Sequence, residues 1–238
     1  MQENLETVRR EILPWAGDSV VAFYLETHPS FPYKEQFAKL FVEAYHAYLS
    51  GCSRASIIVA GEALLRAIYD QIICLVAKGY SVEIFKARGR SIHLEEGTSV
   101  ATLHQLTDEC SFHAAIKALG QLNIYSQDLI NKMRVVKDLR NRATHGDFPL
   151  FDEWDPDDPR PREQLRQILS DQDFEFPEGY RFLLDRDGAD WFTIDLREYK
   201  CRSLKSLGTA DRFAVIQYLL VLEIISKLKD ASTLNKSV

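Results

Sequence analysis

The sequence predicts an all-α fold, a helical bundle that carries a small β-hairpin insert before its last helix. Several long segments repeat apolar residues at helical spacing, and Pro- or Gly-containing loops separate them. Clear two-residue alternation occurs around Asp187-Gly188, between residues 180 and 196, where it predicts the hairpin. The 238 residues, 46% of them hydrophobic, suffice for one large core or two small ones.

The first elements are a short amphipathic segment and a long helix. Residues 5 to 12 form the amphipathic segment, which Pro14 ends, and the segment up to residue 34 is expected to be an N-terminal extension of the bundle. Residues 35 to 49 are expected to form the first long helix, because aromatic residues recur there at helical spacing: Phe37, Phe41, Tyr45 and Tyr48.

The second helix is predicted over residues 54 to 78. Ser53 is its expected N-cap, and Gly79 suits the position after its C-terminal end. Two adjacent apolar stripes run along this helix, so it is either deeply buried or part of a subunit interface. Glu62 is the one carboxylate placed inside the second stripe.

The remaining chain is expected to contain four more helices, one of them short, and a long insert. Residues 80 to 110 suggest a loop with a short helix at 100 to 109, and helices follow at 112 to 122 and 126 to 145. Residues 147 to 208 form the insert, an acidic, Pro-rich loop followed by the hairpin. The last helix covers 211 to 228, with Thr209 as N-cap, and residues 35 to 146 with 209 to 230 make up the bundle.

Composition excludes several functional classes. The net charge of −6 predicts no general affinity for nucleic acid, so a polyanion site must be a local basic patch. The four scattered cysteines lack zinc spacing, and the acidic stretch after residue 151 is interrupted by prolines, so no metal site is expected. A reduced, cytoplasmic protein without a membrane span is expected, because the N-terminus lacks an apolar signal core.

The end of the fourth helix carries the candidate chemistry, in the stretch RNRATH. Arg140 falls on the side of the helix that should face the core, which is defined by Leu129, Met133, Val136 and Ala143. A guanidinium remains charged in proteins and needs a partner when it points inward. Because Glu62 is the lone inward carboxylate expected, we predict an Arg140–Glu62 ion pair between the second and fourth helices.

A basic face adjoins this predicted pair. Asn141 and His145 are spaced i, i+4 and therefore share one face. His145 lies in the last turn, where the helix dipole favours the imidazolium and makes it a candidate general acid or base. Further cations on this helix are expected to bind the phosphates of RNA: Arg134, Lys137 and Arg142, with Lys132 nearby.

These residues resemble the RNxxxH motif of the HEPN superfamily, in which an Arg precedes a His near the end of a late helix of a small bundle. The resemblance covers roughly residues 35 to 146 and the last helix. It implies a metal-independent endoribonuclease, with no cofactor, that leaves a 2′,3′-cyclic phosphate. By the resemblance, His145 would activate the 2′-OH or protonate the leaving oxygen, Arg140 would stabilise the phosphate, Asn141 would orient the site and Glu62 would join it.

The resemblance also implies partners. HEPN ribonucleases dimerise so that two motifs face one cleft, and many act in toxin–antitoxin or antiviral defence systems. A homodimer, an RNA substrate and an antitoxin or defence protein are therefore expected. Some HEPN toxins have a Tyr two residues after the His, which a partner modifies; Asp147 occupies that position here, so that mode of silencing is not expected.

Two other interpretations remain open. The cationic residues at the helix end could compensate the helix dipole and cap its carbonyls, and Glu62 with Arg140 could be a purely structural pair. The same fold could also serve as a non-catalytic dimerisation or protein-interaction module. The acidic net charge favours such a module, whereas the complete set of Arg, Asn and His favours the ribonuclease.

Overall fold

The computed structural model describes residues 5–13, 33–85, 91–99, 106, 110–145 and 209–232, and most of these residues are helical. In chain order the elements are α1 (Leu5–Ile12), α3 (Lys34–Leu49), α4 (Ser53–Ala77), β1 (Val82–Phe85), β2 (Ser91–Leu94), α6 (Phe112–Gln121), α7 (Gln127–His145) and α10 (Thr209–Ser232). None of the helices described is long and apolar enough to cross a lipid bilayer.

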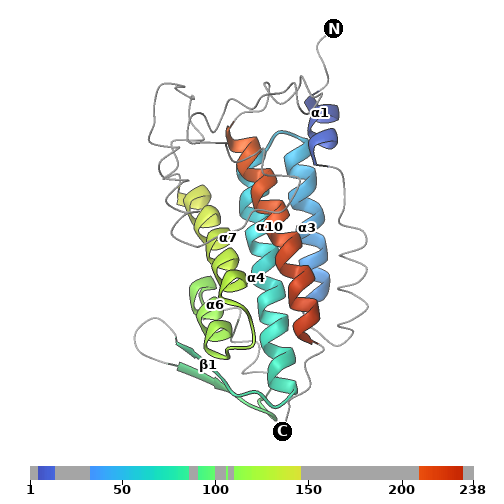
Figure 1. Ribbon diagram of the computed structural model, residues 1–238. Helices are drawn as coiled ribbons and strands as arrows, with labels where there is room; N and C mark the ends of the chain where they lie inside the picture. The colour runs from blue at the N-terminus through green and yellow to red at the C-terminus, as the bar shows by residue number, and fades with distance from the viewer. Residues whose placement is uncertain are drawn as a thin grey trace.

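The long helix α4 is the centre of the bundle. It contacts α3, α7 and α10, which run alongside it, while α6 and the β-hairpin lie together at one end (Figure 1). Contacts between the first turn of α4 and the last turn of α7 make these two helices antiparallel. The helices α4 and α10 begin at the same end of the bundle.

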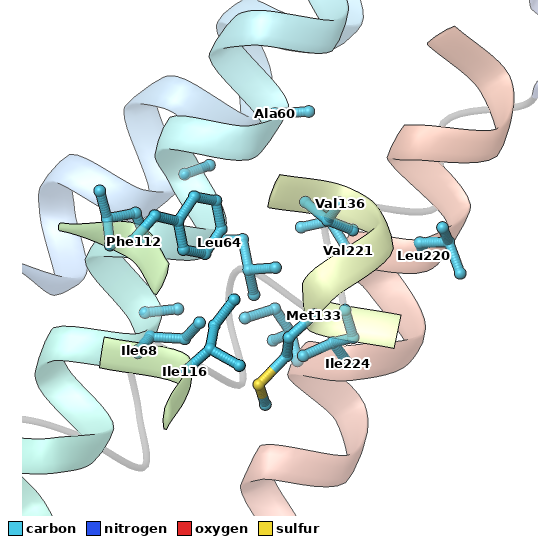
Figure 2. Close-up of a cluster of buried hydrophobic side chains, with 14 of the residues drawn as sticks. Ala60, Leu64, Ile68, Phe112, Ile116, Met133, Val136, Leu220, Val221 and Ile224 are labelled. Carbon is cyan, nitrogen blue, oxygen red and sulfur yellow. The ribbon is translucent and has the colours of Figure 1, made fainter. Parts of the chain in front are cut away.

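One part of the core forms where α4, α6, α7 and α10 meet. Figure 2 shows apolar side chains from all four helices pointing toward one another in this region. The labelled residues are Ala60, Leu64 and Ile68 of α4, Phe112 and Ile116 of α6, Met133 and Val136 of α7, and Leu220, Val221 and Ile224 of α10. Burial on several sides explains why the α4 sequence is apolar on two adjacent stripes.

The predicted helices that fall within the described residues are confirmed, with small shifts at their ends. The shifts are one or two residues, apart from the last helix, which continues to Ser232. Gly79 has a φ of +80° directly after α4, as expected of a C-terminal glycine. The Tyr80 amide then donates to the Leu75 carbonyl at 3.0 Å and the Gly79 amide to the Val76 carbonyl at 2.9 Å, which closes the helix end.

The predicted cap at Ser53 is wrong. Cys52 occupies the N-cap position of α4, with no hydrogen bond from its side chain to the helix. Ser53 lies inside the helix, and its hydroxyl donates to the Asp211 carboxylate at the start of α10. The serine therefore joins two helices, a role that local sequence rules do not anticipate.

Residues 82 to 94 also differ from the prediction of a loop. The strands β1 and β2 form an antiparallel pair in which Val82 lies opposite Leu94 and Ile84 opposite Ile92. These four side chains are buried, while the alternate ones are exposed, because α6 contacts β1. The hairpin predicted around Asp187-Gly188, the rest of the insert 147 to 208 and most of the helix predicted at 100 to 109 lie outside the described residues.

The apolar circumference of α10 is covered within the chain. Residues 213 to 221 are all buried by contacts with neighbouring helices, chiefly α4 and α7. Burial in the bundle accounts for the apolar character of this helix. Dimerisation therefore stays a prediction without support from this helix.

A buried ion pair attaches α1 to the bundle. The guanidinium of Arg9 donates to both carboxylate oxygens of Asp211, at 3.2 and 3.4 Å, and the same carboxylate accepts the Ser53 hydroxyl. Gly51 leaves room for this arrangement, because a Cβ there would lie 3.1 Å from the guanidinium and its φ is +79°. Burial, with a smaller contribution from the Asp211 charge, raises the pKa of the neighbouring Tyr48 hydroxyl, so the phenol remains neutral.

Removing Arg9 is expected to destabilise the protein. The Arg9 and Asp211 side chains are only 13% and 9% exposed, so Arg9→Met leaves a buried carboxylate without its counter-charge. We expect the free energy of unfolding to fall by about 2–4 kcal/mol in urea denaturation. The matched control is Arg10→Met, which breaks an exposed pair with Glu6 and should cost less than about 1 kcal/mol. Equal losses in the two variants would contradict this account.

Candidate functional site at the end of α7

The predicted ion pair between α4 and α7 is present. The Nε of Arg140 donates to Oε1 of Glu62 at 3.0 Å, and its Nη2 donates to the same oxygen. The two side chains are 27% and 24% exposed, so the pair lies at the edge of the core and remains accessible from outside. An antiparallel packing of α4 on α7 places these two residues at the same height in the bundle.

Asn141 accepts a further hydrogen bond from this guanidinium. Nη1 of Arg140 donates to the side-chain oxygen of Asn141 at 3.0 Å. Three of the five N–H donors of Arg140 are thus engaged within the described residues, which leaves two for a ligand. A planar guanidinium held in this way can present a fixed pair of donors to a phosphate.

Glu62 is not the lone inward carboxylate that the sequence suggested. Asp70, two turns further along α4, is fully buried and accepts the backbone amide of Tyr33 at 3.0 Å. Asp211 is also buried, and its donors are Ser53 and Arg9. Each of these carboxylates has its own donors elsewhere in the bundle, so the pairing of Glu62 with Arg140 depends on their matching heights.

Arg54 is a further residue at this site that the sequence analysis missed. Its guanidinium donates to the carbonyl oxygens of Ala143, at 2.7 Å, and Thr144, at 3.2 Å. These carbonyls belong to the last turn of α7, which has no following turn to satisfy them. Arg54 therefore caps the end of α7 from the first turn of α4 and adds a cation beside the motif. The sequence shows that Arg54 lies in the first turn of the second helix. That it caps α7 follows only from the antiparallel packing of α4 on α7.

His145 is the last residue of α7, and it is exposed. Within the described segments it makes no hydrogen bond or ion pair, and the polar partners of Arg140 and Glu62 do not include it. It does share a face of α7 with Asn141, one turn earlier, as the spacing predicts. The ring is therefore open to a ligand approaching the end of the helix.

Three of the four flanking cations lie near the motif, and the fourth, Lys132, does not. Arg134 donates to the side chain of Asn131 at 3.1 Å, and Lys137 pairs with Asp138 at 2.8 Å. Both are half-buried residues whose spacing places them on the flank that carries Asn141. Arg142 is also half-buried and lies in the last turn of α7.

Lys132 does not belong to this basic face. Its side chain is 4% exposed and its Nζ lies 2.6 Å from Oε1 of Glu223 and 3.1 Å from Oδ2 of Asp128. Lys227 of α10 pairs with the same two carboxylates, at 2.8 and 3.7 Å. These four residues link α7 to α10 on another side of the helix, and Lys132 is a structural cation.

No family model, curated protein or solved structure matches this chain. The resemblance to HEPN domains consequently stays a prediction that rests on the motif residues of the sequence.

Candidate metal ligands do not gather near this site. Across the described ranges, His, Cys, Asp and Glu side chains form no group of three or more that could hold a metal ion. Among the described cysteines, Cys52 and Cys74 are free thiols, and burial raises the pKa of Cys74.

Proposed function

We propose that this protein is a metal-independent endoribonuclease of the HEPN type. The observation that carries the proposal is the geometry of Arg140, which Glu62 and Asn141 hold at the edge of the core with two N–H donors left over. His145 is exposed on the same terminal turns. A guanidinium fixed for phosphate binding and an accessible imidazole on the same turns are two of the groups that transesterification of RNA uses.

The reaction begins when the ribose 2′-oxygen attacks the adjacent phosphorus. A base takes the 2′-OH proton, the bond from phosphorus to the 5′-oxygen breaks, and an acid protonates that leaving oxygen. The products are a 2′,3′-cyclic phosphate and a 5′-OH. His145 serves as the base or the acid, and Arg140 stabilises the extra negative charge on the phosphate oxygens in the transition state.

Two copies of the chain would complete this chemistry. One His145 can hold a proton or accept one at a given moment, whereas the reaction needs both a base and an acid. A homodimer that brings two ends of α7 together supplies two imidazoles and two guanidinium groups. Its local positive charge would also offset the net charge of −6 when RNA approaches.

The proposed setting is a cytoplasmic toxin–antitoxin or defence system. An RNA-cleaving enzyme would need a partner protein that restrains it until it is required. The presence of Asp147, in place of a modifiable Tyr two residues after His145, favours restraint by binding rather than by modification of that position.

A non-catalytic interaction module is the second candidate. Two observations favour it: among the described residues His145 makes no hydrogen bond or ion pair with Arg140 or Glu62, and Glu62 already compensates the Arg140 charge. In that case the ion pair joins α4 to α7 and the end of α7 contacts a protein.

The deciding experiment is incubation of the purified protein with a mixed RNA substrate in excess EDTA, followed by analysis of the product ends. We expect cleavage that leaves 2′,3′-cyclic phosphate and 5′-OH ends. Cleavage that requires a metal ion, or that leaves 3′-OH ends, would contradict the proposal. Intact RNA at protein concentrations high enough to populate a dimer would favour the interaction module.

A further inference from the structure

We infer that Gly61 and Gln217 are positioning residues that seat Arg140 against Glu62. This inference deepens the proposed function and rests on it for its effect on RNA cleavage, but the seating itself can be measured separately. Neither residue is part of the RNxxxH motif, and they come from two different helices, α4 and α10.

Gly61 allows the Arg140 side chain to cross α4 at very close range. A Cβ at position 61 would lie 2.7 Å from both Cβ and Cγ of Arg140. These atoms are next to the α7 backbone and cannot swing away as the tip of a side chain can. Glycine is otherwise unfavourable inside a helix, so its position in the middle of α4 fits a need for close approach.

Gln217 holds the two helices together at this crossing. It is fully buried on α10, and its Nε2 donates to the carbonyl oxygens of Val136, at 3.0 Å, and Ile57, at 3.3 Å. In an α-helix these two carbonyls also accept the amides of Arg140 and Gly61, four residues later. The amide therefore ties together the turns that immediately precede the two crossing residues.

Gln217 is not the side chain that burial alone would favour at this position. Its Oε1 is buried without a hydrogen-bond partner among the described residues, and such an atom is costly to bury. A methionine would fill similar space without that cost. The Nε2 atom also lies 3.3 Å from the place that a Gly61 Cβ would occupy, so both residues bound the space that Arg140 enters.

Together these contacts fix where the aliphatic part of the Arg140 side chain crosses α4 and how closely it approaches that helix. They therefore fix the direction in which the guanidinium points toward Glu62. In Gly61→Ala the stem must move by several tenths of an ångström or more. A displacement near 1 Å in a catalytic constellation can slow a reaction on the order of 100-fold. Gly120→Ala is the matched control, because a Cβ there lies 3.7 Å from Ile130, an ordinary contact.

The test reads the Nε–H resonance of Arg140 by ¹⁵N NMR, assigned by its loss in Arg140→Lys. In Gly61→Ala we expect this resonance to move toward the position it has in Glu62→Gln, where the ionic partner is gone. Gly120→Ala should leave it unchanged. Cleavage of RNA should fall on the order of 100-fold in Gly61→Ala and remain unchanged in Gly120→Ala.

Gln217→Met provides a second variant in case Gly61→Ala does not fold. It should also shift the Arg140 resonance, because the bridge between the two carbonyls is lost. An unmoved Arg140 resonance in the folded variants would overturn the inference, whether or not the protein cleaves RNA. If the wild type does not cleave RNA but the variants shift the Arg140 resonance as expected, the proposed ribonuclease activity is refuted. The inference that Gly61 and Gln217 position Arg140 would still hold.

Discussion

Replacing His145 with Ala is expected to slow RNA cleavage by about 100- to 10,000-fold, the usual contribution of a positioned acid–base group. Of the side-chain types in the motif, imidazole is the one that most often serves as a general acid or base. Because His145 is exposed at the end of α7, its removal should change the free energy of unfolding by less than about 0.5 kcal/mol. The measurement is a single-turnover cleavage rate beside a urea unfolding curve.

His113→Ala is the control for this substitution. His113 is also exposed, in the first turn of α6, and lies outside the motif. Its variant should cleave at the wild-type rate. Added imidazole should partly restore cleavage by His145→Ala, since the site is open to solvent. Equal rates in the wild type and both variants would remove His145 from the chemistry.

Replacing Glu62 with Ala is expected to damage both stability and activity. The Arg140 guanidinium, 27% exposed, would lose its anionic partner and with it two hydrogen bonds. Because solvent still reaches the pair, we expect a loss of about 1–3 kcal/mol in the free energy of unfolding, less than for a fully buried pair. Cleavage should fall on the order of 100-fold, because a guanidinium released from Glu62 no longer has a fixed direction.

A double-mutant cycle separates the pair from general disruption. Arg140→Met and Glu62→Ala should be clearly non-additive in stability, with a coupling of at least about 0.5 kcal/mol. Glu43→Ala, at an exposed position of α3, controls for loss of a carboxylate from the surface. Additive losses would show that the contact contributes nothing to the stability of the bundle.

Helical periodicity was sufficient to predict most of the described fold. Each long helix places apolar residues on the side that meets its neighbours, and that pattern depends on the local sequence alone. The Arg140–Glu62 pair could be predicted for a related reason. A charged side chain on an apolar face requires a partner, and few candidates were available on the facing helix.

Most of the features that the sequence did not predict are contacts between elements that are distant in sequence. Ser53 looks like a helix cap until the start of α10 is placed beside it, and Arg54 becomes a cap for α7 only in the antiparallel register. Gly61 and Gln217 have no local signature of their roles. The hairpin at 82 to 94 was missed because each strand is only four residues long, too short for its alternation to stand out from a loop.

The most direct test of the ribonuclease compares two RNA oligonucleotides that differ by one 2′-OH, at a mapped cleavage site, in excess EDTA. The account predicts that the protein cleaves the unmodified strand there to a 2′,3′-cyclic phosphate and leaves the 2′-deoxy position intact, because the attacking oxygen is missing. Cleavage of both strands at that position with equal rates would contradict it.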